Sequence, residues 1–408
     1  MNTLKNIKTF NAGRDAERLA LKYAHMRTDP FVFLRGSCHL FYDHLSKIAP
    51  LPASPSVWVC GDLHLENFGS YKGDNRLSYF DINDFDETVL APASWDILRF
   101  LTSLRVGAQT LGINPDEVTA LCLSFLTTYA NALVLGKSRW LERDTADGAI
   151  GKLLNSLRER RRVDFLDKRT ERNGKQRQLR IDGKKALKAS DKQRLKVTNF
   201  IEKFAAQQPN PAFYKVLDVA LRIAGTGSLG VERYAVLVEG KGSPNSNFLL
   251  DLKQAMPSSL ARHVKSLKIE QPQWLSEAHR VVTVQSRVQA VSMAFLQPVR
   301  VGKAAYVLRD LQPVEDRVVL SRDSLSKPEL HQAINTMASL LAWAQLRSAG
   351  FHGSAIADAL SDFGRNLKWH KKLLSASADC AVLVTYDWVN YAEAFDDGYF
   401  KILDKSAD

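Results

Sequence analysis

The stretch "CGDLHLENFG", residues 60–69, brings together side chains that could move a proton and hold a metal ion. Asp62 and Asn67 stand five residues apart, a spacing found in loops that transfer phosphoryl groups. In such a loop the aspartate orients or deprotonates the attacking hydroxyl, and the asparagine amide oxygen binds Mg²⁺. We therefore predict that Asp62 is catalytic and that Asn67 is a metal ligand. His64, two residues after Asp62, could help to orient a substrate.

A second acidic stretch, "YFDINDFDE" at 79–87, follows after a hairpin-length gap. Asp84 could supply the main metal carboxylate, because carboxylate and amide oxygens suit Mg²⁺, which also takes substrate phosphates. The rival interpretation is a metallophosphoesterase, since G-D-x-H can hold a catalytic metal. That site needs further paired carboxylates and several histidines, and no "GNH"-type loop follows in this chain. A purely structural polar turn is the other alternative, but it does not explain Asp84.

The stretch "GTGSLG" at 225–230 could cover phosphates with its backbone. A bare G-x-G-x-x-G is a weak signal, so the context decides. The alternating apolar run "VERYAVLVEG" follows, which indicates that the glycines join two strands, as in the glycine-rich flap of a protein kinase. We predict that Gly225, Gly227, Ser228 and Gly230 bind a nucleotide. An ordinary glycine hairpin is the alternative.

Lys253 lies in "FLLDLKQA", on the third expected strand after the start of this flap. A lysine inside an otherwise apolar strand must place its charge on a partner. Contact with the phosphates of a nucleotide is the functional interpretation, and an exposed lysine on an edge strand is the alternative. Its position after a glycine-rich hairpin favours the first.

These parts fit a kinase-like site, but their order along the chain is reversed. The catalytic half lies at 61–96 and the nucleotide half at 225–253, whereas a kinase has the flap and the lysine first. The two halves can still meet if the chain is circularly permuted, which folds tolerate when the ends lie at the surface. The long helix expected at 328–350 supports permutation, because it stands where a kinase places the helix that leads into the catalytic loop.

Several motifs resemble a bacterial family catalogued as domain of unknown function 2252, over most of the chain. They are "CGDLHLENFG", "FDINDFDETVLAPASWDILR", "FLRGS" at 33–37 and "GTGSLGVERY" with "LLDLKQA". The catalytic stretch also resembles aminoglycoside and choline phosphotransferases, whose loop reads H-G-D-x-x-x-x-N before "IDF". In those enzymes a second aspartate starts the next helix and braces the loop, and Asp96 has that place here. The resemblance implies a kinase-like, circularly permuted fold with an ATP–Mg²⁺ site.

The chain departs from that pattern at three places, one of which is His64, two residues after Asp62. Cys60 stands where the phosphotransferases carry histidine before Gly-Asp. The helix after Lys253 has no obvious glutamate to pair with the lysine, and the candidates are Glu277, Gln285 and Gln289. Arg35, in "FLRGS", is a further candidate for contact with an anion, and a structural salt bridge is the alternative.

The length and composition predict a folded protein with two or more lobes, and the expected helices and strands predict the α+β class. The 408 residues are 45% hydrophobic and 25% charged, and the N-terminus has no apolar signal core. We expect a helical catalytic portion with a basic hairpin at 1–210, a β-rich nucleotide-binding lobe at 211–320, and helices at 321–408 that complete the helical lobe. Residues 14–48 and the stretch "AHRVVTVQSRVQAVSMAFL" are expected to be helical. No apolar run approaches the ~20 residues of a membrane span. Four scattered cysteines suggest reduced thiols in a cytoplasmic protein.

The positive charge is concentrated in one segment. The net charge is +12, and residues 152–203 contain 18 Lys and Arg against 7 Asp and Glu. Within this segment "RTERNGKQRQLRI" predicts a hairpin turning at Asn173-Gly174. The segment could bind nucleic acid, an acidic partner or an anionic substrate, or be a solvated surface.

Three functions follow from these observations. The first is an ATP- and Mg²⁺-dependent phosphotransferase that acts on a small molecule or protein. The second keeps the site but transfers adenylyl from a nucleotide bound in the opposite direction. The third is a nucleotide-sensing pseudokinase that binds nucleic acid or an acidic partner through residues 152–203.

Overall fold

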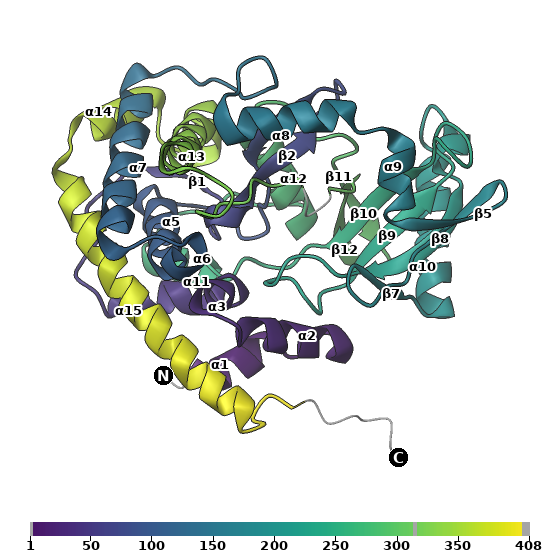
Figure 1. Ribbon diagram of the computed structural model, residues 1–408, viewed down its shortest axis with the longest axis horizontal. Helices are drawn as coiled ribbons and strands as arrows, with labels where there is room; N and C mark the ends of the chain where they lie inside the picture. Colours follow the sequence, from purple (N-terminus) through teal and green to yellow (C-terminus); the bar gives the residue numbers. More distant parts are fainter. Residues whose placement is uncertain (1–2, 313–315, 402–408) are drawn as a thin grey trace.

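The chain folds into a helical part and a part built on an antiparallel sheet, as seen in the computed structural model (Figure 1). The structure describes residues 3–312 and 316–401. About 49% of the described residues are helical and about 16% are in strands. The expected mixed α+β class is therefore confirmed.

Short helices with clear start signals make up the N-terminal region. Asp15 accepts a hydrogen bond from the backbone N–H of Arg18 at the start of α2, and Asp29 caps α3, whose first residue is Pro30. These caps break the continuous helical region expected over 14–48 into separate segments. They are α1 (Thr3–Phe10), α2 (Ala16–Met26), α3 (Pro30–Gly36), α4 (Cys38–Phe41) and the 3-10 helix η1 (Tyr42–Ser46).

Two pairs of short strands and the helices after them carry the first chemical motifs. Strand β1 (Ser56–Val59) pairs with β4 (Val89–Pro92), and β2 (Phe68–Lys72) pairs with β3 (Ser78–Ile82). The loop 60–67, with the 3-10 helix η2 (Leu65–Asn67), joins β1 to β2. The helices that follow are α5 (Ser94–Val106), α6 (Ala108–Leu111) and α7 (Pro115–Leu135).

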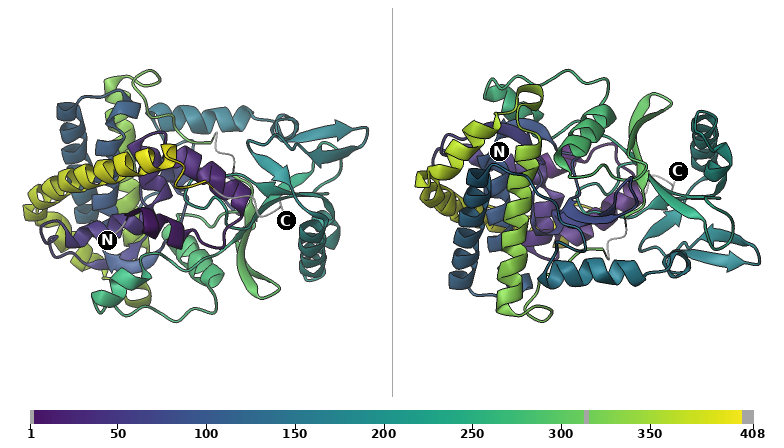
Figure 2. Two further views of the ribbon diagram at one scale, coloured as in Figure 1. Left: turned by 90° about the horizontal axis from the view of Figure 1, so that it is seen from below. Right: turned by 90° about the horizontal axis from the view of Figure 1, so that it is seen from above.

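The C-terminal helices pack back onto this N-terminal region. They are α13 (Lys327–Arg347), η4 (Phe351–Gly353), α14 (Ala357–Arg365) and α15 (Lys368–Asp396). Helix α13 packs against α7, and α15 runs along α5 and α3, so that yellow and purple segments lie together in both views of Figure 2. Residues from both ends of the chain therefore share one hydrophobic core.

Helix α7 meets the length and apolarity of a membrane span, although the sequence analysis expected no such segment. Half of its most apolar window is buried within the protein. Asn114 caps its N-terminus and Pro115 is its first residue. Its contacts with α13 and α14 are those of a core helix.

A six-stranded antiparallel sheet forms the second part, in the order β11-β12-β10-β9-β8-β7. Strands β8 (Val216–Arg222), β9 (Arg233–Val238) and β10 (Phe248–Gln254) follow one another as a meander. Two helices, α11 (Ala261–Ser266) and α12 (Glu277–Val288), come before β11 (Gln297–Val301) and β12 (Ala304–Asp310). Helix α12 ends at Val288, before the end of the helix expected from "AHRVVTVQSRVQAVSMAFL".

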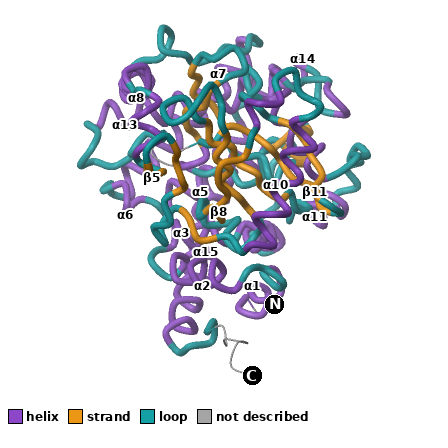
Figure 3. Tube along the Cα trace, turned by 90° about the vertical axis from the view of Figure 1, so that its right-hand side faces the viewer, coloured by secondary structure: helices purple, strands orange, loops and turns teal. Residues whose placement is uncertain are grey.

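Helix α10 (Asp191–Ala205) covers one face of this sheet. Val197 and Ile201 of α10 share a core with Val219, Tyr234 and Leu250 of the strands. In the view from the sheet side, α10, β5, β8 and β11 face the reader (Figure 3). The other face carries Ala220, Ala235 and Leu249, which pack in a separate core with Leu311.

The basic segment 152–203 is folded and spans both parts of the molecule. Its elements are α8 (Gly148–Glu159), α9 (Arg162–Asp167), β5 (Thr170–Asn173), β6 (Gln176–Leu179), β7 (Ala186–Lys188) and α10. The hairpin predicted at Asn173-Gly174 is confirmed by the pairing of β5 with β6. Because β7 pairs with β8, the sheet begins before residue 211, where the expected β-rich lobe was set to start.

The end of α13 lies beside the beginning of β1. The backbone N–H of Ala355 donates to the carbonyl oxygen of Ser56 at 2.7 Å, and the indole N–H of Trp58 donates to the carbonyl oxygen of Phe351 at 2.9 Å. The segment after the long C-terminal helix is thus next to the strand that leads into residues 60–67.

Candidate functional site

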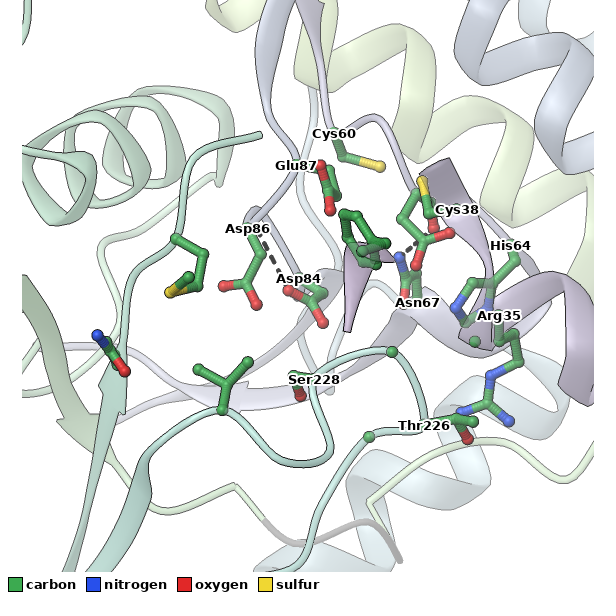
Figure 4. Close-up of a pocket in the computed structure, with 18 of the residues that line it drawn as sticks. Arg35, Cys38, Cys60, His64, Asn67, Asp84, Asp86, Glu87, Thr226 and Ser228 are labelled. Atoms are coloured by element: carbon green, nitrogen blue, oxygen red, sulfur yellow. Dashed lines mark hydrogen bonds between the residues drawn. The ribbon is translucent and has the colours of Figure 1, made fainter. Parts of the chain in front are cut away.

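One cavity between the two parts collects most of the residues predicted from the sequence (Figure 4). Its lining includes the predicted polar residues of the N-terminal half, which are Arg35, Asp62, His64, Asn67 and Asp84. It also includes Gly225, Gly227 and Ser228 from the turn between β8 and β9. Residues separated by more than 100 positions therefore face one space.

Three predicted residues lie next to the cavity rather than in its lining. Gly230 turns away with a φ of +87°, and a Cβ there would lie 2.8 Å from the Cβ of Arg14. Lys253 is only 4% exposed and lies behind Asp84 and Asp86. Asp96 is buried beneath the loop 60–67.

Asp96 holds the start of this loop by its backbone. Its two carboxylate oxygens accept hydrogen bonds from the backbone N–H of Cys60 at 2.8 Å and of Gly61 at 3.0 Å. Burial raises the pKa of Asp96 to about 6, against the opposing effect of these two donors. Gly61 has a φ of +82°, and a Cβ there would lie 2.6 Å from the carbonyl oxygen of Glu87, so only glycine fits this close approach.

Asp62 is paired with Arg99, a partner that the sequence analysis did not identify. Nε of the fully buried Arg99 donates to Oδ1 of Asp62 at 2.8 Å, and a second guanidinium nitrogen contacts the same oxygen. Burial raises the pKa of Asp62, while Arg99 acts in the opposite direction. Since Asp62 is still 22% exposed, its second carboxylate oxygen can face the cavity.

His64 and Asn67 are fixed by the local turn. The ring Nδ1 of His64 accepts a hydrogen bond from the backbone N–H of Glu66 at 3.1 Å, and burial lowers the pKa of His64 well below its usual value. The imidazole is therefore neutral at pH 7. The side-chain amide of Asn67 donates to the carbonyl oxygen of Asp62 at 2.5 Å, which leaves the amide oxygen of Asn67 for another partner.

Lys253 contacts the acidic stretch "DFDE" rather than a residue of the following helix. Its ammonium lies 3.9 Å from Asp84 and in direct contact with Asp86. Desolvation raises the pKa of Asp84, but Lys253 and Arg309 outweigh it and leave the pKa below its usual value. Of the candidate partners, Glu277 pairs with Arg280, Gln285 bonds to Gln289, and Gln289 donates to Ile82. The partner of Lys253 is thus Asp86.

The glycine-rich turn is fastened by cations from the N-terminal helices. Arg14 donates to the carbonyl oxygens of Gly227 at 2.8 Å and Leu229 at 3.1 Å, and Arg18 donates to that of Val231 at 2.9 Å. The buried ammonium of Lys22 also donates to Gly227, at 2.9 Å. No motif in the sequence pointed to this contact, because it joins residues more than 200 positions apart.

Arg35 is one of two arginines that form ion pairs with Glu66. Its guanidinium lies 2.8 Å from Glu66, and Arg317 lies 3.1 Å from the same carboxylate. Both arginines also line the cavity, so the two interpretations of Arg35 are compatible. Arg317 follows the end of the sheet and was not identified from the sequence.

The acidic groups do not form a dense metal cluster. Over residues 3–312 and 316–401, no group of three or more His, Cys, Asp or Glu side chains is arranged to hold a metal. Asp84, with a side chain 45% exposed, and Asn67 both line the cavity, which Asp62, Asp86 and Glu87 also line. Such a donor pair fits Mg²⁺, which is commonly held by one or two protein oxygens and by phosphates.

The four cysteines do not form disulfides. Cys38, Cys60, Cys122 and Cys380 are all buried and unpaired. Burial raises the pKa of the Cys60 thiol, which accords with a structural role for the residue that precedes Gly61.

The chain matches the model of one protein family over residues 14–394. That family is described as an uncharacterized protein conserved in bacteria (DUF2252). Because the match covers most of the chain, the protein belongs to this family, as the sequence resemblance indicated. No curated protein and no solved structure matches the chain.

Proposed function

We propose that this protein is an ATP- and Mg²⁺-dependent phosphotransferase of kinase-like type, acting on a hydroxyl group of a small molecule or a protein. The observation that carries the proposal is the convergence of separate segments on one cavity. Residues from the segments 60–67, 84–87 and 225–228 line it, and Lys253 contacts Asp84 and Asp86 of the second segment. Each segment has the residue types that phosphoryl transfer requires.

The strand arrangement supports a kinase-like lobe. The glycine-rich turn joins the first two strands of a meander, and Lys253 lies on the third. Helices follow this strand and two further strands complete the sheet. In protein kinases the glycine-rich loop and the lysine have the same relation.

The contact between the end of α13 and β1 supports circular permutation. If residues 351–355 were joined to residue 56, the long helix would lead directly into the loop that contains Asp62. Their backbones are already hydrogen-bonded at this point. A single circular permutation would then account for both the position of the chain ends and the reversed order of the motifs.

The residues have distinct roles in the proposed reaction. Asp62 accepts the proton of the acceptor hydroxyl and orients its oxygen toward phosphorus. Lys253 and the backbone of 225–228 hold phosphate oxygens. Asp96 and Arg99 act through Asp62, because they fix the loop and the carboxylate rather than touch the substrate.

Asp84 and Asn67 would hold the Mg²⁺ ion. When bound, Mg²⁺ neutralises charge on the phosphates and helps to fix their geometry. In the structure Lys253 contacts Asp86 and lies near Asp84, so it balances part of their negative charge, and Mg²⁺ would balance more of it. The catalytic effect expected of the protein itself is positioning and electrostatic stabilisation.

The pseudokinase alternative has less support from the basic segment. Several of its cations pair with acidic residues elsewhere in the chain, among them Lys152 with Glu329, Arg194 with Asp218 and Lys196 with Glu232. These pairs use part of the positive charge to hold the fold. Binding to nucleic acid would have to use the rest, and it would weaken steeply with salt.

Thermal unfolding with and without Mg–ATP tests the proposed function. A ligand at a hundred times its Kd stabilises a protein by about 2.7 kcal/mol, which gives a readable rise in Tm. We expect this rise for the wild type and a much smaller one for Lys253→Ala and Asp84→Asn. Asp144→Asn, on the exposed surface, is the matched control and should respond as the wild type does.

An absence of any shift would count against the proposal, provided that other nucleoside triphosphates and Mn²⁺ are also without effect. A shift that both cleft variants retain would place the nucleotide elsewhere. If no nucleotide raises the Tm, the next measurement is the binding of nucleic acid to the basic segment at several salt concentrations.

A further inference from the structure

A second cavity lies beside the loop 60–67, next to the cavity that Asp62 and Asp84 line (the first cavity). Its volume is about 300 Å³, a size found among binding sites for small molecules. Much of its lining is apolar and comes from α3, the loop, α6 and the segment after the sheet: Phe31, Leu65, Leu111, Val318, Val319 and Leu320. The lining also includes the charged residues Glu66 and Arg317. The second cavity can therefore hold a ligand with an apolar body.

The loop 60–67 separates the two cavities. His64 and Asn67 of this loop line the first cavity. Leu65 and Glu66, which lie between them in the sequence, line the second. A ligand in the second cavity is therefore separated from the first only by this short stretch of chain, which also carries the proposed base.

Glu66 and two arginines form the boundary between the cavities. Arg35 lines the first cavity and Arg317 lines both. Each arginine contacts the carboxylate of Glu66. The side chains of Arg317 and Glu66 are 25% and 40% exposed, so solvent reaches this boundary. A ligand can therefore lie across the boundary with one end in each cavity.

The boundary lies away from Lys253, which is proposed to hold phosphates. In Figure 4 Arg35 and His64 are on the opposite side of the first cavity from Asp86, the partner of Lys253. In the part of the chain that the structure describes, neither the acidic stretch 84–87 nor the glycine-rich turn lines the second cavity. The residues proposed to hold the nucleotide therefore leave the second cavity to the other substrate, the acceptor.

The boundary has a surplus of positive charge. The guanidinium groups of Arg35 and Arg317 share the single carboxylate of Glu66. Burial, with a further contribution from Arg35, lowers the pKa of Arg317. After burial, both arginines also act to lower the pKa of His64. An anionic group would offset this charge and accept hydrogen bonds from the arginines, whereas an ammonium group would add to the repulsion.

We propose that the acceptor is a small hydroxy acid, with an apolar body in the second cavity, its carboxylate at Arg317 and its hydroxyl at Asp62. This inference rests on the proposed function and specifies the class of the acceptor. The hydroxyl oxygen forms a bond to the γ-phosphorus, and the bond from that phosphorus to the β–γ bridging oxygen breaks. ADP leaves with the bonding electron pair, and Asp62 takes the hydroxyl proton. The product is a phosphomonoester of the hydroxy acid.

Equilibrium binding of three probes to the full-length protein, without nucleotide, tests this proposal. They are α-hydroxyoctanoate, lactate, which has the same head group without the long chain, and an amino alcohol in which an aminomethyl group replaces the carboxylate of α-hydroxyoctanoate. Lactate should bind at least about thirtyfold more weakly than α-hydroxyoctanoate, because each buried CH₂ group contributes about a factor of four. The amino alcohol should bind at least about tenfold more weakly, because it cannot accept a hydrogen bond from Arg317 through a charged group.

Val319→Asn reports on the apolar body. Val319 is 66% exposed, so its replacement should leave the fold intact. We expect about fivefold weaker binding of α-hydroxyoctanoate and unchanged binding of Mg–ATP, because only the first has a chain in the second cavity. Val382→Asn, at a position on α15 that is 69% exposed, is the matched control and should bind both as the wild type does.

Arg317→Gln reports on the charge at the boundary. It should reduce the preference for α-hydroxyoctanoate over the amino alcohol at least about tenfold, because the remaining pair of Arg35 and Glu66 is neutral. Arg322→Gln, which changes an exposed arginine nearby in the chain, is the matched control and should keep the preference. A wild type that prefers the amino alcohol, or binding of α-hydroxyoctanoate that Val319→Asn and Arg317→Gln leave unchanged, would overturn the inference and leave the proposed phosphotransferase intact.

Transfer of labelled phosphate distinguishes an acceptor from a ligand that only binds. Label from the γ-phosphate of Mg–ATP should appear in α-hydroxyoctanoate, and Asp62→Asn should abolish the labelling. A protein that binds Mg–ATP but does not label α-hydroxyoctanoate would overturn the inference alone. If the wild type does not bind Mg–ATP, the proposed function fails, and the role of the hydroxy acid as acceptor fails with it.

Discussion

The two walls of the cleft are held in place by different kinds of contact. The wall that contains Asp62 is braced by residues close in sequence, since Asp96 and Arg99 lie within 40 positions of the groups they bind. The wall made by the glycine-rich turn is braced by Arg14, Arg18 and Lys22, more than 200 positions away. The first wall is held mainly by residues near it in sequence, although Arg317 also contacts its Glu66, and the second wall is held by contacts with the N-terminal segment.

This difference explains which of the two loops can be recognised from the sequence alone. A loop fixed by neighbours in sequence has its whole pattern in one stretch, so spacing alone can reveal it. When a loop is fixed by distant cations, its own sequence reveals only the glycines and not the residues that hold it. Three variants test whether the two walls depend on their braces in this way.

Loss of Arg99 should have the largest effect. Arg99→Leu removes the buried partner of Asp62 and leaves that carboxylate unpaired. The unfolding free energy should fall by about 3 kcal/mol. This is the lower end of the cost of breaking a buried ion pair, because Asp62 is partly exposed. Chemical denaturation of the wild type and the variant measures this. The pair Asp62→Leu and Arg99→Leu together should cost less than the sum of the single changes. Additive costs would show that the contact does not brace this wall.

The pH dependence of the unfolding free energy should show the contribution of Asp96, which holds the loop 60–67 together with Arg99. Its folded pKa, about 6, is raised above the ordinary value of an aspartate, so the folded state binds the proton more tightly than the unfolded state does. Its contribution to stability is therefore present at low pH and is lost as the pH rises from about 4 to about 6. The total change is on the order of 2 to 3 kcal/mol.

Comparison with Asp96→Asn isolates this contribution, because other titrating groups are common to both proteins. The difference in unfolding free energy, wild type minus variant, should fall between pH 4 and pH 6 and be flat above pH 7. A difference that rises over this interval would mean that the folded state favours the carboxylate, contrary to the burial argument.

A smaller effect is expected from the distant brace of the other wall. Arg18→Met leaves the carbonyl oxygen of Val231 without its partner and removes the side-chain contact with Asp15, at a cost of about 1 to 3 kcal/mol. Asp15 keeps its hydrogen bond from the backbone N–H of residue 18. Hydrogen exchange should become faster in residues 225–231 and stay unchanged in residues 60–67. Arg27→Met, which breaks the exposed contact with Asp396, is the control and should leave both segments unchanged. Equal changes in both segments would mean that the walls are not independent.

The elements were largely predictable from local signals. Caps and prolines mark the starts of α7 and α13, and Asn173-Gly174 marks the hairpin of β5 and β6. The extent of the sheet was not predictable, because β7 joins it across the basic segment from a short stretch with weak strand character. The break-up of the region 14–48 was missed, although Asp29-Pro30 is a helix-start signal that could have shown it.

The residue types of the candidate site were predictable from the sequence, but only some of the contacts between these residues were. Spacing pointed to Asp62, Asn67 and Asp84, and the resemblance to phosphotransferases supplied the bracing role expected of Asp96. In the structure Asp96 accepts two backbone hydrogen bonds from the start of the loop. Asp86 as the partner of Lys253 was missed because a carboxylate was sought in the following helix. The signal was present in "NDFDE", where a second aspartate follows Asp84 by two positions.

The sequence by itself determined which residues could do chemistry and where the chain turns, because spacing, capping and glycine conformations are properties of short stretches. Only the tertiary structure decided which of these residues meet. The pairing of Lys253 with Asp86 and the fastening of the glycine-rich turn both join distant segments. The physical reason is that a buried charge must find a partner wherever the fold brings one, and its position along the chain does not reveal that partner.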